Sequence, residues 1–414
     1  MVPLRTSNDY VEILDLFQRI SHCSEVAQVK RLEAAHKQTD SHSFSFSAAS
    51  RGLFKKILRI ALSQRFSELR VEFLDVDGSY GEGGGQILRT TLAFSIITGR
   101  PVRISKIRAG REIPGLRRQH VSSLRVLGAV FDSKLNGVAE GSSEVSFVPG
   151  HPRTDSISLD MKTAASITLV LQAVIPAVAL TRSRLTLELV GGTDVPWSPT
   201  FDYFDSIVRR AYGAIGIKFS VKAIRRGYYP RGGGRAVVSV EPCEALQPLR
   251  LTESPRVKAV DLASRCALLP RHVAERQLSS AVAALEEKGL CIGQKLIAEE
   301  PADSPGSSVL VSSSGDSFFL GSDGLGAKGR PSEEVGRVAA EKFASCVRLG
   351  ACVDDNLADM LAPLLSLASG PSALRAARVS KHLDAGFYIA KLFSSCEYSV
   401  REEAQGAVIA VRPG

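Results

Sequence analysis

The chain has 414 residues, of which 44% are hydrophobic and 23% are charged. At about 100–200 residues per domain this length predicts two or three domains, and the near-average composition excludes a wholly disordered chain. Its seven cysteines are scattered without a Cys-x-x-Cys pair. This pattern excludes a zinc ribbon and a thioredoxin motif, and it favours a reducing cytoplasm.

Positive charge is concentrated in two segments of a chain whose net charge is +9. Residues 100–125 hold eight basic side chains and one acidic side chain, and residues 222–235 hold five basic side chains and no acidic one. Solvent-facing helices usually carry both signs of charge. One-signed segments therefore indicate a polyanionic partner, such as RNA or the phosphates of a nucleotide.

Residues 1–70 differ from the rest and predict a helical, low-complexity appendage. Helical spacing covers 9–37, Ser, His and Phe dominate 41–50, and 51–66 predicts a basic amphipathic helix. That helix could bind a membrane surface or RNA, or the whole segment could be upstream sequence translated from a misassigned start codon. The order of features that marks a secretory signal is absent.

From residue 71 onward the sequence predicts alternating strands and helices, and hence an α/β fold. Strands are expected at 71–77, 102–110, 184–192 and 236–242, and helices at 86–99, 117–130 and 201–216. The longest apolar run, 167–180, is shorter than the ~20 residues that cross a bilayer. We expect it to be a buried helix that Pro176 ends or kinks.

The pattern of predicted elements changes between about residues 250 and 345, and this change predicts an inserted domain. Here a helix is expected at 272–289, a strand at 308–314 and a Gly/Ser-rich loop at 321–332. The predicted organisation is an appendage at 1–70, a main domain at 71–250 and 346–414, and an inserted domain at 251–345. Glycine turns at 83, 191 and 232 are unevenly spaced, so they do not establish an internal repeat.

The segment DGSYGEGGGQILR, residues 77–89, is the strongest motif. Its three consecutive glycines let backbone N–H groups approach an anion at the start of a helix, although a simple tight turn would look the same. It matches neither a Walker A loop nor a Gly-x-Gly-x-x-Gly turn. Glu82 and Arg89 add a carboxylate and a cation, and a carboxylate beside phosphates usually requires a divalent metal.

Three further motifs follow along the chain. The arginine-rich segment 107–120 could surround phosphates, or it could be a solvated basic loop. The segment 191–204 contains the sole tryptophan, and a structured turn with Trp197 packed is expected there. In GYYPRGGGR, 227–235, two tyrosines beside arginines could stack on bases, or the segment could be a plain hairpin.

Together with TLVLQ (168–172) and PRHVAER (270–276), these motifs resemble the RNA 3′-terminal phosphate cyclase family, from about residue 71 to the C-terminus. The resemblance implies an α/β fold of repeated β-α-β-α-β-β modules, as in enolpyruvyl transferases, with a smaller inserted α/β domain. It also implies ATP-dependent conversion of an RNA 3′-terminal phosphate to a 2′,3′-cyclic phosphodiester. The implied route passes through a covalent AMP–histidine and an RNA-adenylate.

The resemblance assigns site residues by position. The nucleophile would be His382, although a lone histidine is more often an ordinary surface or core residue and only its position within the family pattern favours this role. Glu82 would hold Mg²⁺ or Mn²⁺. The residues that would bind ATP are Arg89, Gln172, Asn356, Leu357, Ala358, Asp359 and Met360. The residues that would bind the RNA 3′-phosphate end are Arg108, Arg111, Gln119 and His120.

The chain departs from the family pattern at several positions that we expect to cluster at the nucleotide site. Ala385 and Gly386 replace a Thr-Asn pair, and Lys162 and Ala165 occupy positions where the family favours glycine. Asn356 stands where many relatives have Tyr or His.

Two alternatives to the enzyme remain. A non-catalytic branch of the family, which binds RNA and proteins in ribosome biogenesis, lacks the nucleophilic histidine, so His382 favours the enzyme. An enolpyruvyl transferase would share the fold but not these motifs. The expected partners are RNA 3′-phosphate ends and no membrane, while the oligomeric state is left open, a homodimer being one option.

Overall fold

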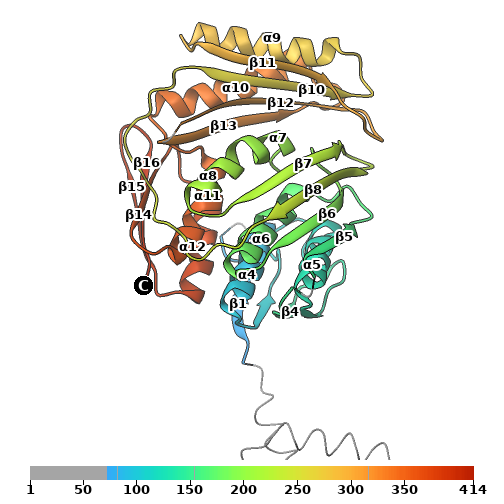
Figure 1. Cartoon of the computed structure of the whole chain (residues 1–414), viewed down its shortest axis with the longest axis vertical. Coiled ribbons are helices and arrows are strands. Elements are labelled where there is room, and N and C mark those ends of the chain that lie inside the picture. The colour runs from blue at the N-terminus through green and yellow to red at the C-terminus, as the bar shows by residue number, and fades with distance from the viewer. Residues whose placement is uncertain (1–71, 82, 153, 316) are drawn as a thin grey trace, which may run out of the picture. The chain divides into compact units, whose positions relative to one another are not determined.

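Three modules of the same topology build most of the described chain, which comprises residues 72–414 except 82, 153 and 316 in this computed structural model (Figure 1). The first contains β1 (Leu74–Asp77), α4 (Gly85–Thr98), β2 (Val102–Ser105), α5 (Arg118–Phe131), β3 (Lys134–Asn136) and β4 (Val145–Val148). Its sheet has the order β1-β2-β4-β3. The β1–β2 pair is parallel, and the other two pairs are antiparallel. The predictions for residues 1–70 lie outside the described residues.

The second module repeats this plan in the sheet order β5-β6-β8-β7. It contains β5 (Ser156–Asp160), α6 (Ile167–Leu180), β6 (Leu185–Gly191), α7 (Phe201–Tyr203), a π-helical turn (Phe204–Val208), α8 (Arg209–Ala214), β7 (Phe219–Arg225) and β8 (Gly234–Val240). Again the first pair of strands is parallel and the other pairs are antiparallel.

The third module follows the same plan in the order β9-β14-β16-β15, with β9 and β14 parallel. It contains β9 (Arg250–Leu251), α11 (Asp355–Leu364), a 3₁₀ turn (Leu365–Leu367), β14 (Ser372–Ala376), α12 (Lys381–Phe393), β15 (Glu397–Glu402) and β16 (Ala407–Arg412). The repeated β-α-β-α-β-β module is therefore confirmed. The glycine turns at 83, 191 and 232 did not reveal the repeat, because the third module lies after them and a long insertion separates its β9 from its α11.

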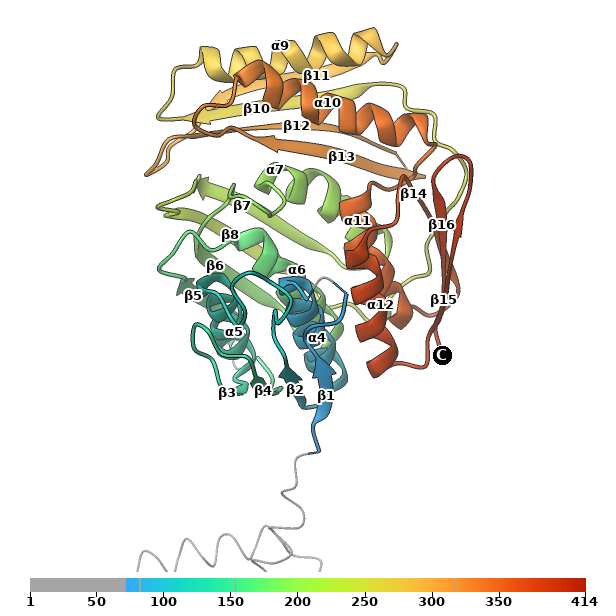
Figure 2. The ribbon, with the colours of Figure 1, turned by 180° about the vertical axis from the view of Figure 1, so that it is seen from behind.

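The insertion between β9 and α11 is a smaller α/β layer, as the fold class predicted. It contains β10 (Val260–Ala267), α9 (His272–Glu287), β11 (Ile292–Glu299), β12 (Gly306–Gly315), β13 (Phe318–Leu325) and α10 (Ser332–Arg348). Its strands take the order β11-β10-β12-β13, with α9 and α10 side by side on one face (Figures 1 and 2). The exact domain boundaries stay a prediction, since Glu72–Gly414 form one unit.

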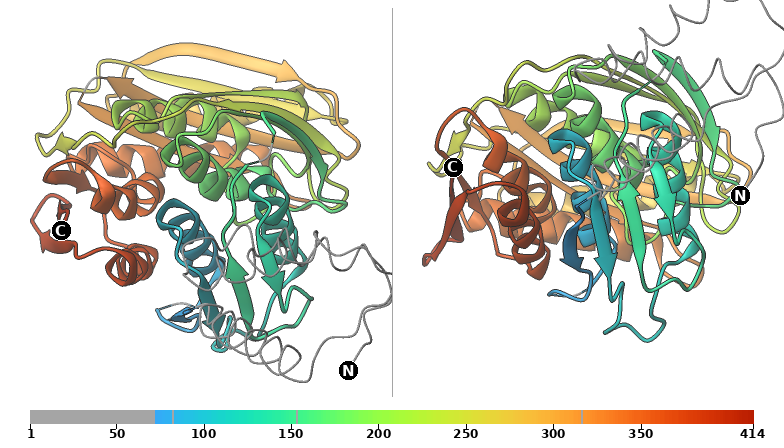
Figure 3. Two further views of the ribbon diagram at one scale, coloured as in Figure 1. Left: turned by 60° about the horizontal axis from the view of Figure 1, so that its bottom comes forward. Right: turned by 90° about the horizontal axis from the view of Figure 1, so that it is seen from below.

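Helix α4 lies at the centre of the core and packs against α6, α12 and α5 (Figure 3). Residues 167–180 form the predicted buried helix, α6, but Pro176 does not end it, because the helix continues to Leu180. A helix that is apolar on all sides is stable only when it is surrounded by protein. In the described part of the chain, no helix combines the length and apolar character needed to cross a membrane.

One sequence prediction in the insertion is wrong. Residues 321–325, expected to be a Gly/Ser-rich loop, belong to strand β13. Glycine usually weakens a strand, but here it permits close packing. A Cβ at Gly321 would lie 2.8 Å from Ile207 Cγ1 and from the Tyr203 ring, so the missing side chain lets β13 pack against the α7 region.

Asp354 links the insertion to the two modules beside it. As the N-cap of α11, its Oδ1 accepts from the Leu357 N–H at 3.0 Å, and Oδ2 accepts from the Gly321 N–H of β13 at 3.0 Å. The buried Tyr203 hydroxyl donates to Oδ1 at 2.7 Å. One carboxyl therefore fixes the start of α11, whose next residues face the cavity described below.

Candidate active site

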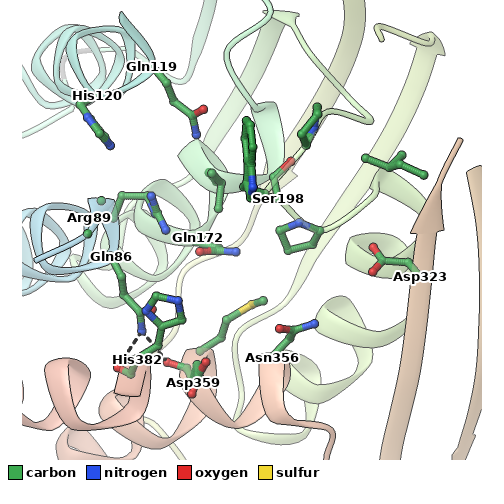
Figure 4. Close-up of a pocket in the computed structure, with 18 of the residues that line it drawn as sticks. Gln86, Arg89, Gln119, His120, Gln172, Ser198, Asp323, Asn356, Asp359 and His382 are labelled. Atoms are coloured by element: carbon green, nitrogen blue, oxygen red, sulfur yellow. Dashed lines mark hydrogen bonds between the residues drawn. The ribbon is translucent and has the colours of Figure 1, made fainter. Parts of the chain in front are cut away.

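The modules and the insertion enclose a cavity of about 1520 Å³ (Figure 4). Its walls come from the start of α4, the loop before α5, α6, the loop before α7, β13, α10, α11 and the first turn of α12. Most of the predicted site residues line it: Arg89, Arg108, Arg111, Gln119, His120, Gln172, Asn356, Asp359, Met360 and His382. The structure thus brings together residues from segments hundreds of positions apart.

Helix α11 contributes one face to this cavity. Asn356, Asp359 and Met360 line it, whereas Leu357 and Ala358 are buried on the opposite side of the helix. The spacing i, i+3 and i+4 is that of one helical face. Within the predicted nucleotide-binding segment, therefore, Leu357 and Ala358 belong to the core, and their assigned role in binding ATP stays a prediction.

Two arginines in the cavity carry buried nitrogen atoms without hydrogen-bond partners among the described residues. These atoms are Arg89 Nε and Arg108 Nη1. Burial lowers the pKa of Arg89 to about 10, and burial together with the charges of Arg111 and Arg117 lowers the pKa of Arg108. Both side chains stay cationic at neutral pH. A buried cation without a counter-charge is costly, so this wall of the cavity favours an anion.

His120 is a neutral member of the same cluster. Its Nδ1 accepts a hydrogen bond from the Arg117 backbone N–H at 3.0 Å, which leaves the ring proton on Nε2. Burial, followed by the charges of Arg89, Arg108 and Arg117, lowers its pKa to about 3. His120 therefore offers an N–H donor, rather than a third positive charge, to a bound anion.

Gly85, the first residue of α4, leaves room for this cluster. A Cβ there would lie 2.6 Å from His120 Nε2 and 2.9 Å from Arg89 Nη1. Any larger residue would displace one of these groups. This close approach is the structural role of the last glycine in the Gly-rich motif.

His382 lies in the first turn of α12, held by two neighbouring elements. Ser380, the N-cap, accepts hydrogen bonds from the backbone N–H of His382 at 3.0 Å and of Leu383 at 3.2 Å. The Ser380 hydroxyl also donates to Asp359 Oδ1 at 2.6 Å. Gln86 Nε2 donates to the backbone carbonyls of His382 at 3.2 Å and of Asp359 at 3.4 Å (Figure 4). The histidine backbone is thereby fixed to α4 and α11.

Asp359 is largely enclosed between α11 and the Ser380 cap. Burial raises its pKa to about 7, and the hydrogen bond from Ser380 offsets part of that effect. Its protonation state therefore changes near neutral pH, next to the segment that carries His382.

The expected clustering of sequence departures at the nucleotide site is wrong for four of the five positions. Lys162 is exposed and pairs with Asp160 Oδ2 at 2.9 Å, and its φ of +57° explains why a glycine suits this position. Neither Lys162 nor the buried Ala165, Ala385 and Gly386 lines the cavity, and among the departures only Asn356 does.

Gly386 has a packing role instead. A Cβ there would lie 2.5 Å from Pro363 Cγ, so the glycine lets α12 approach α11.

Comparison with known proteins decides the family. Residues 80–400 match the profile of a family described as RNA 3′-terminal phosphate cyclase. The chain belongs to that family. This confirms the resemblance read from the motifs and, with it, the assignment of the chain as a cyclase-family enzyme.

Several proteins named RNA 3′-terminal phosphate cyclase are similar over most of the chain. The protein from Hyperthermus butylicus is 44% identical over 77% of this chain and 90% of its own length. The one from Pyrococcus furiosus is 42% identical over 79% of this chain and 94% of its own length. Among solved structures, the enolpyruvyl transferase NikO from Streptomyces tendae matches with 10% identity and a TM-score of 0.23, over 82% of this chain and 65% of its own.

The predicted metal ligand of this cyclase-family chain, Glu82, lies outside the described residues. Among those that are described, no group of three or more His, Cys, Asp or Glu side chains could hold a metal ion.

Sequence reasoning missed some residues that line or support the cavity. Gln86 acts through long-range contacts with backbone carbonyls, whereas Ser380 acts through its hydroxyl, and only this serine before a helix gave a signal, as a typical N-cap. Asp323 of β13 lines the cavity although its segment was expected to be a loop.

The two motifs that contain aromatic residues, 191–204 and 227–235, also differ in part from the sequence predictions. Trp197, expected to be packed, is 97% exposed and lines the cavity. The segment 227–235 connects β7 to β8 as a hairpin, with Tyr228 buried and Tyr229 exposed away from the cavity lining. Stacking of Tyr228 on a base is therefore excluded.

Proposed function

We propose that this protein converts the 3′-terminal phosphate of RNA into a 2′,3′-cyclic phosphodiester at the expense of ATP. The observation that carries the proposal is the pairing of an anion site with a nucleophile. Buried, unpartnered nitrogens of Arg89 and Arg108 share one cavity with His382. Membership of the cyclase family and the names of the relatives at 37–44% identity support the same reaction.

In the proposed first step, an imidazole nitrogen of His382 attacks the α-phosphorus of ATP. The N–P bond forms as the bond to the β-phosphate oxygen breaks, and pyrophosphate leaves. A neutral imidazole is a competent nucleophile near pH 7 with little adjustment of its pKa. Gln86 and Ser380 position the histidine backbone, so the attack starts from a fixed geometry.

In the next steps, an oxygen of the RNA 3′-phosphate attacks the AMP phosphorus and displaces His382, which gives the RNA-adenylate. The neighbouring 2′-hydroxyl then attacks the 3′-phosphate phosphorus, loses its proton and expels AMP. The cyclic ester and AMP are the products, and the histidine is regenerated. Arg89, Arg108 and the His120 N–H would stabilise negative charge on the reacting phosphates.

The size of the cavity supports two ligands at once. A typical small-molecule site has about 300–1,000 Å³, and this cavity has about 1520 Å³. Predicted ATP-binding residues (Gln172, Asn356 and Asp359) and predicted RNA-binding residues (Arg108, Arg111) line the same space. The RNA end can therefore reach the nucleotide without leaving the protein.

The proposed metal is Mg²⁺ or Mn²⁺, held by Glu82. A divalent ion would neutralise charge on the phosphates. Glu82 lies outside the described residues, and among those that are described no group of three or more His, Cys, Asp or Glu side chains could hold a metal ion.

The proposed location is the cytoplasm. Cys243, Cys266, Cys291, Cys346, Cys352 and Cys396 are all free thiols. Free thiols in this number are typical of a reducing compartment.

The test is conversion of a 3′-phosphorylated oligoribonucleotide. With ATP and Mg²⁺ or Mn²⁺, we expect its terminal phosphate to become resistant to phosphatase and the product to carry a 2′,3′-cyclic end. The same RNA with a 3′-hydroxyl is the control and should not change. RNA that binds but is never converted with either metal would contradict the proposal and would favour the non-catalytic RNA-binding alternative.

A further inference from the structure

Trp197 is the least explained residue of the cavity. It is the sole tryptophan of the chain, the residue is 97% exposed, and its φ is +60°. A large apolar side chain left in water adds little to folding, and a bulky residue in the left-handed region is strained. Strain and exposure at the wall of a cavity indicate a binding role.

The backbone that carries this side chain is held firmly. The Ser198 hydroxyl donates to the Val195 carbonyl at 2.8 Å, and the Thr168 hydroxyl of α6 donates to the Pro199 carbonyl at 2.8 Å. Figure 4 shows Ser198, the next residue, across the cavity from His382. The indole is therefore presented from a fixed loop on the wall opposite the proposed nucleophile.

We propose that Trp197 is the stacking platform for a base at the 3′ end of the RNA. This inference rests on the proposed function. Aromatic side chains stack on any base, so they suit an enzyme that acts on ends of varied sequence. Site-bound small ligands are usually about 70–90% buried, whereas the indole is almost wholly exposed. Such a platform fits a strand that continues into solvent better than it fits the enclosed base of ATP.

The sole tryptophan makes the test direct, because all tryptophan fluorescence of the chain comes from this side chain. The full-length protein is titrated, without ATP, with a 3′-phosphorylated oligoribonucleotide, and N-acetyltryptophanamide corrects for light absorbed by the RNA. We expect quenching that follows binding. An oligonucleotide that is abasic at its last two positions but keeps the 3′-phosphate should bind with little quenching.

A second titration distinguishes the adenine of ATP from a base of the RNA as the group that stacks on Trp197. ATP alone should leave the fluorescence nearly unchanged. Quenching by ATP equal to that by RNA would overturn the proposal and assign the platform to the nucleotide. RNA binding, measured by anisotropy of a labelled strand, without quenching would also overturn it.

A pair of variants gives an independent measurement. Trp197→Ala should weaken binding of the 3′-phosphorylated RNA about 5- to 150-fold, which is the range for loss of one stacked base, and Trp197→Phe should restore part of it. Tyr229→Ala removes another aromatic side chain, 67% exposed but outside the cavity lining, and should leave binding unchanged. Unchanged affinity in Trp197→Ala, with its circular dichroism intact, would refute the stacking role.

These binding measurements do not depend on the cyclisation reaction. A protein that stacks RNA on Trp197 but makes no cyclic ends would contradict the proposed function only. A protein that cyclises RNA without quenching would contradict the stacking platform only.

Discussion

The two walls of the cavity are built in different ways. The wall formed by the first module concentrates charge: Arg89 and Arg108 carry buried nitrogens without partners in the described part of the chain, beside a neutral His120. The wall formed by the loop before α7 and by β13 presents the exposed Trp197 and a carboxyl, Asp323, that accepts a hydrogen bond from the Thr200 N–H at 2.6 Å.

The comparison shows which parts of the cavity lower the free energy of unfolding in order to bind ligands. The charged wall lowers stability by burying single guanidinium nitrogens that have no hydrogen-bond partner among the described residues, so it is prepared for anions before any ligand arrives. The aromatic wall lowers stability in another way, through the left-handed backbone and the solvent exposure of Trp197 rather than through buried charge. Variants on the charged wall should therefore change activity and stability in opposite directions.

The largest effect is expected for Arg89→Met. Loss of one preorganised donor to a reacting phosphate typically lowers kcat by about 10²–10³-fold. Because Arg89 Nε is buried without a partner, the methionine variant should also be more stable to urea in the absence of ligands, by about 1–3 kcal/mol. An active variant, or one that is strongly destabilised, would contradict the description of this wall as an anion site.

Gly85→Ala tests how tightly the charged wall is assembled. The added Cβ would meet His120 Nε2 at 2.6 Å and Arg89 Nη1 at 2.9 Å. Displacing these groups by about 1 Å should lower cyclisation about 10²-fold. Gly110→Ala, at a glycine in the same region with no atom within 4 Å of an added Cβ, is the matched control. Equal activities of the two variants would show that the close approach at Gly85 has no catalytic importance.

Asp359→Asn tests the buried carboxyl between the two walls. Since burial raises its pKa from 3.8 to about 7, the folded state holds the proton more tightly than the unfolded state does. Below pH ~4 the raised pKa contributes up to about 4 kcal/mol to the free energy of unfolding. This contribution is lost as the pH rises through about 7.

Urea unfolding between pH 4 and 8 measures this contribution. The asparagine variant should show a flatter dependence of stability on pH over that range. A wild-type protein whose stability does not fall relative to the variant as the pH approaches 8 would exclude the raised pKa.

The smallest effect is expected for Lys162→Gly, which restores a glycine at a left-handed position outside the cavity. Relief of the φ of +57° should stabilise the fold by about 1 kcal/mol, while loss of the exposed pair with Asp160 should cost less than about 1 kcal/mol. Cyclisation should stay within about 2-fold of the parent. A large change in activity would place this segment in the site after all.

The charged wall could be predicted from sequence, but the aromatic wall could not. Glycine-rich and arginine-rich motifs pointed to Arg89, Arg108 and His120, because glycines at a helix start and clustered arginines are both typical of an anion site. Gln86 was not predicted, since its contact with His382 spans 296 positions along the chain.

Two errors have the same physical cause. Glycine in 321–325 suggested a loop because it weakens strands, yet at Gly321 the absent side chain makes room for Tyr203 and Ile207. Likewise, Ala385 and Gly386 suggested a damaged nucleotide site, yet both are buried in the core rather than exposed to the cavity. What a small residue lies against is set by tertiary packing, which a single sequence does not reveal.

The central claim is that His382 carries AMP during the reaction. The most direct measurement is incubation with ATP labelled at the α-phosphate and Mg²⁺ or Mn²⁺, followed by denaturation and mapping of the labelled peptide. We predict acid-labile label on His382, transferred to a 3′-phosphorylated RNA when one is added. His382→Ala should carry no label, whereas His151→Ala, at an exposed histidine outside the cavity lining, should be labelled normally. Label that persists in His382→Ala, or that maps to another residue, would contradict the account.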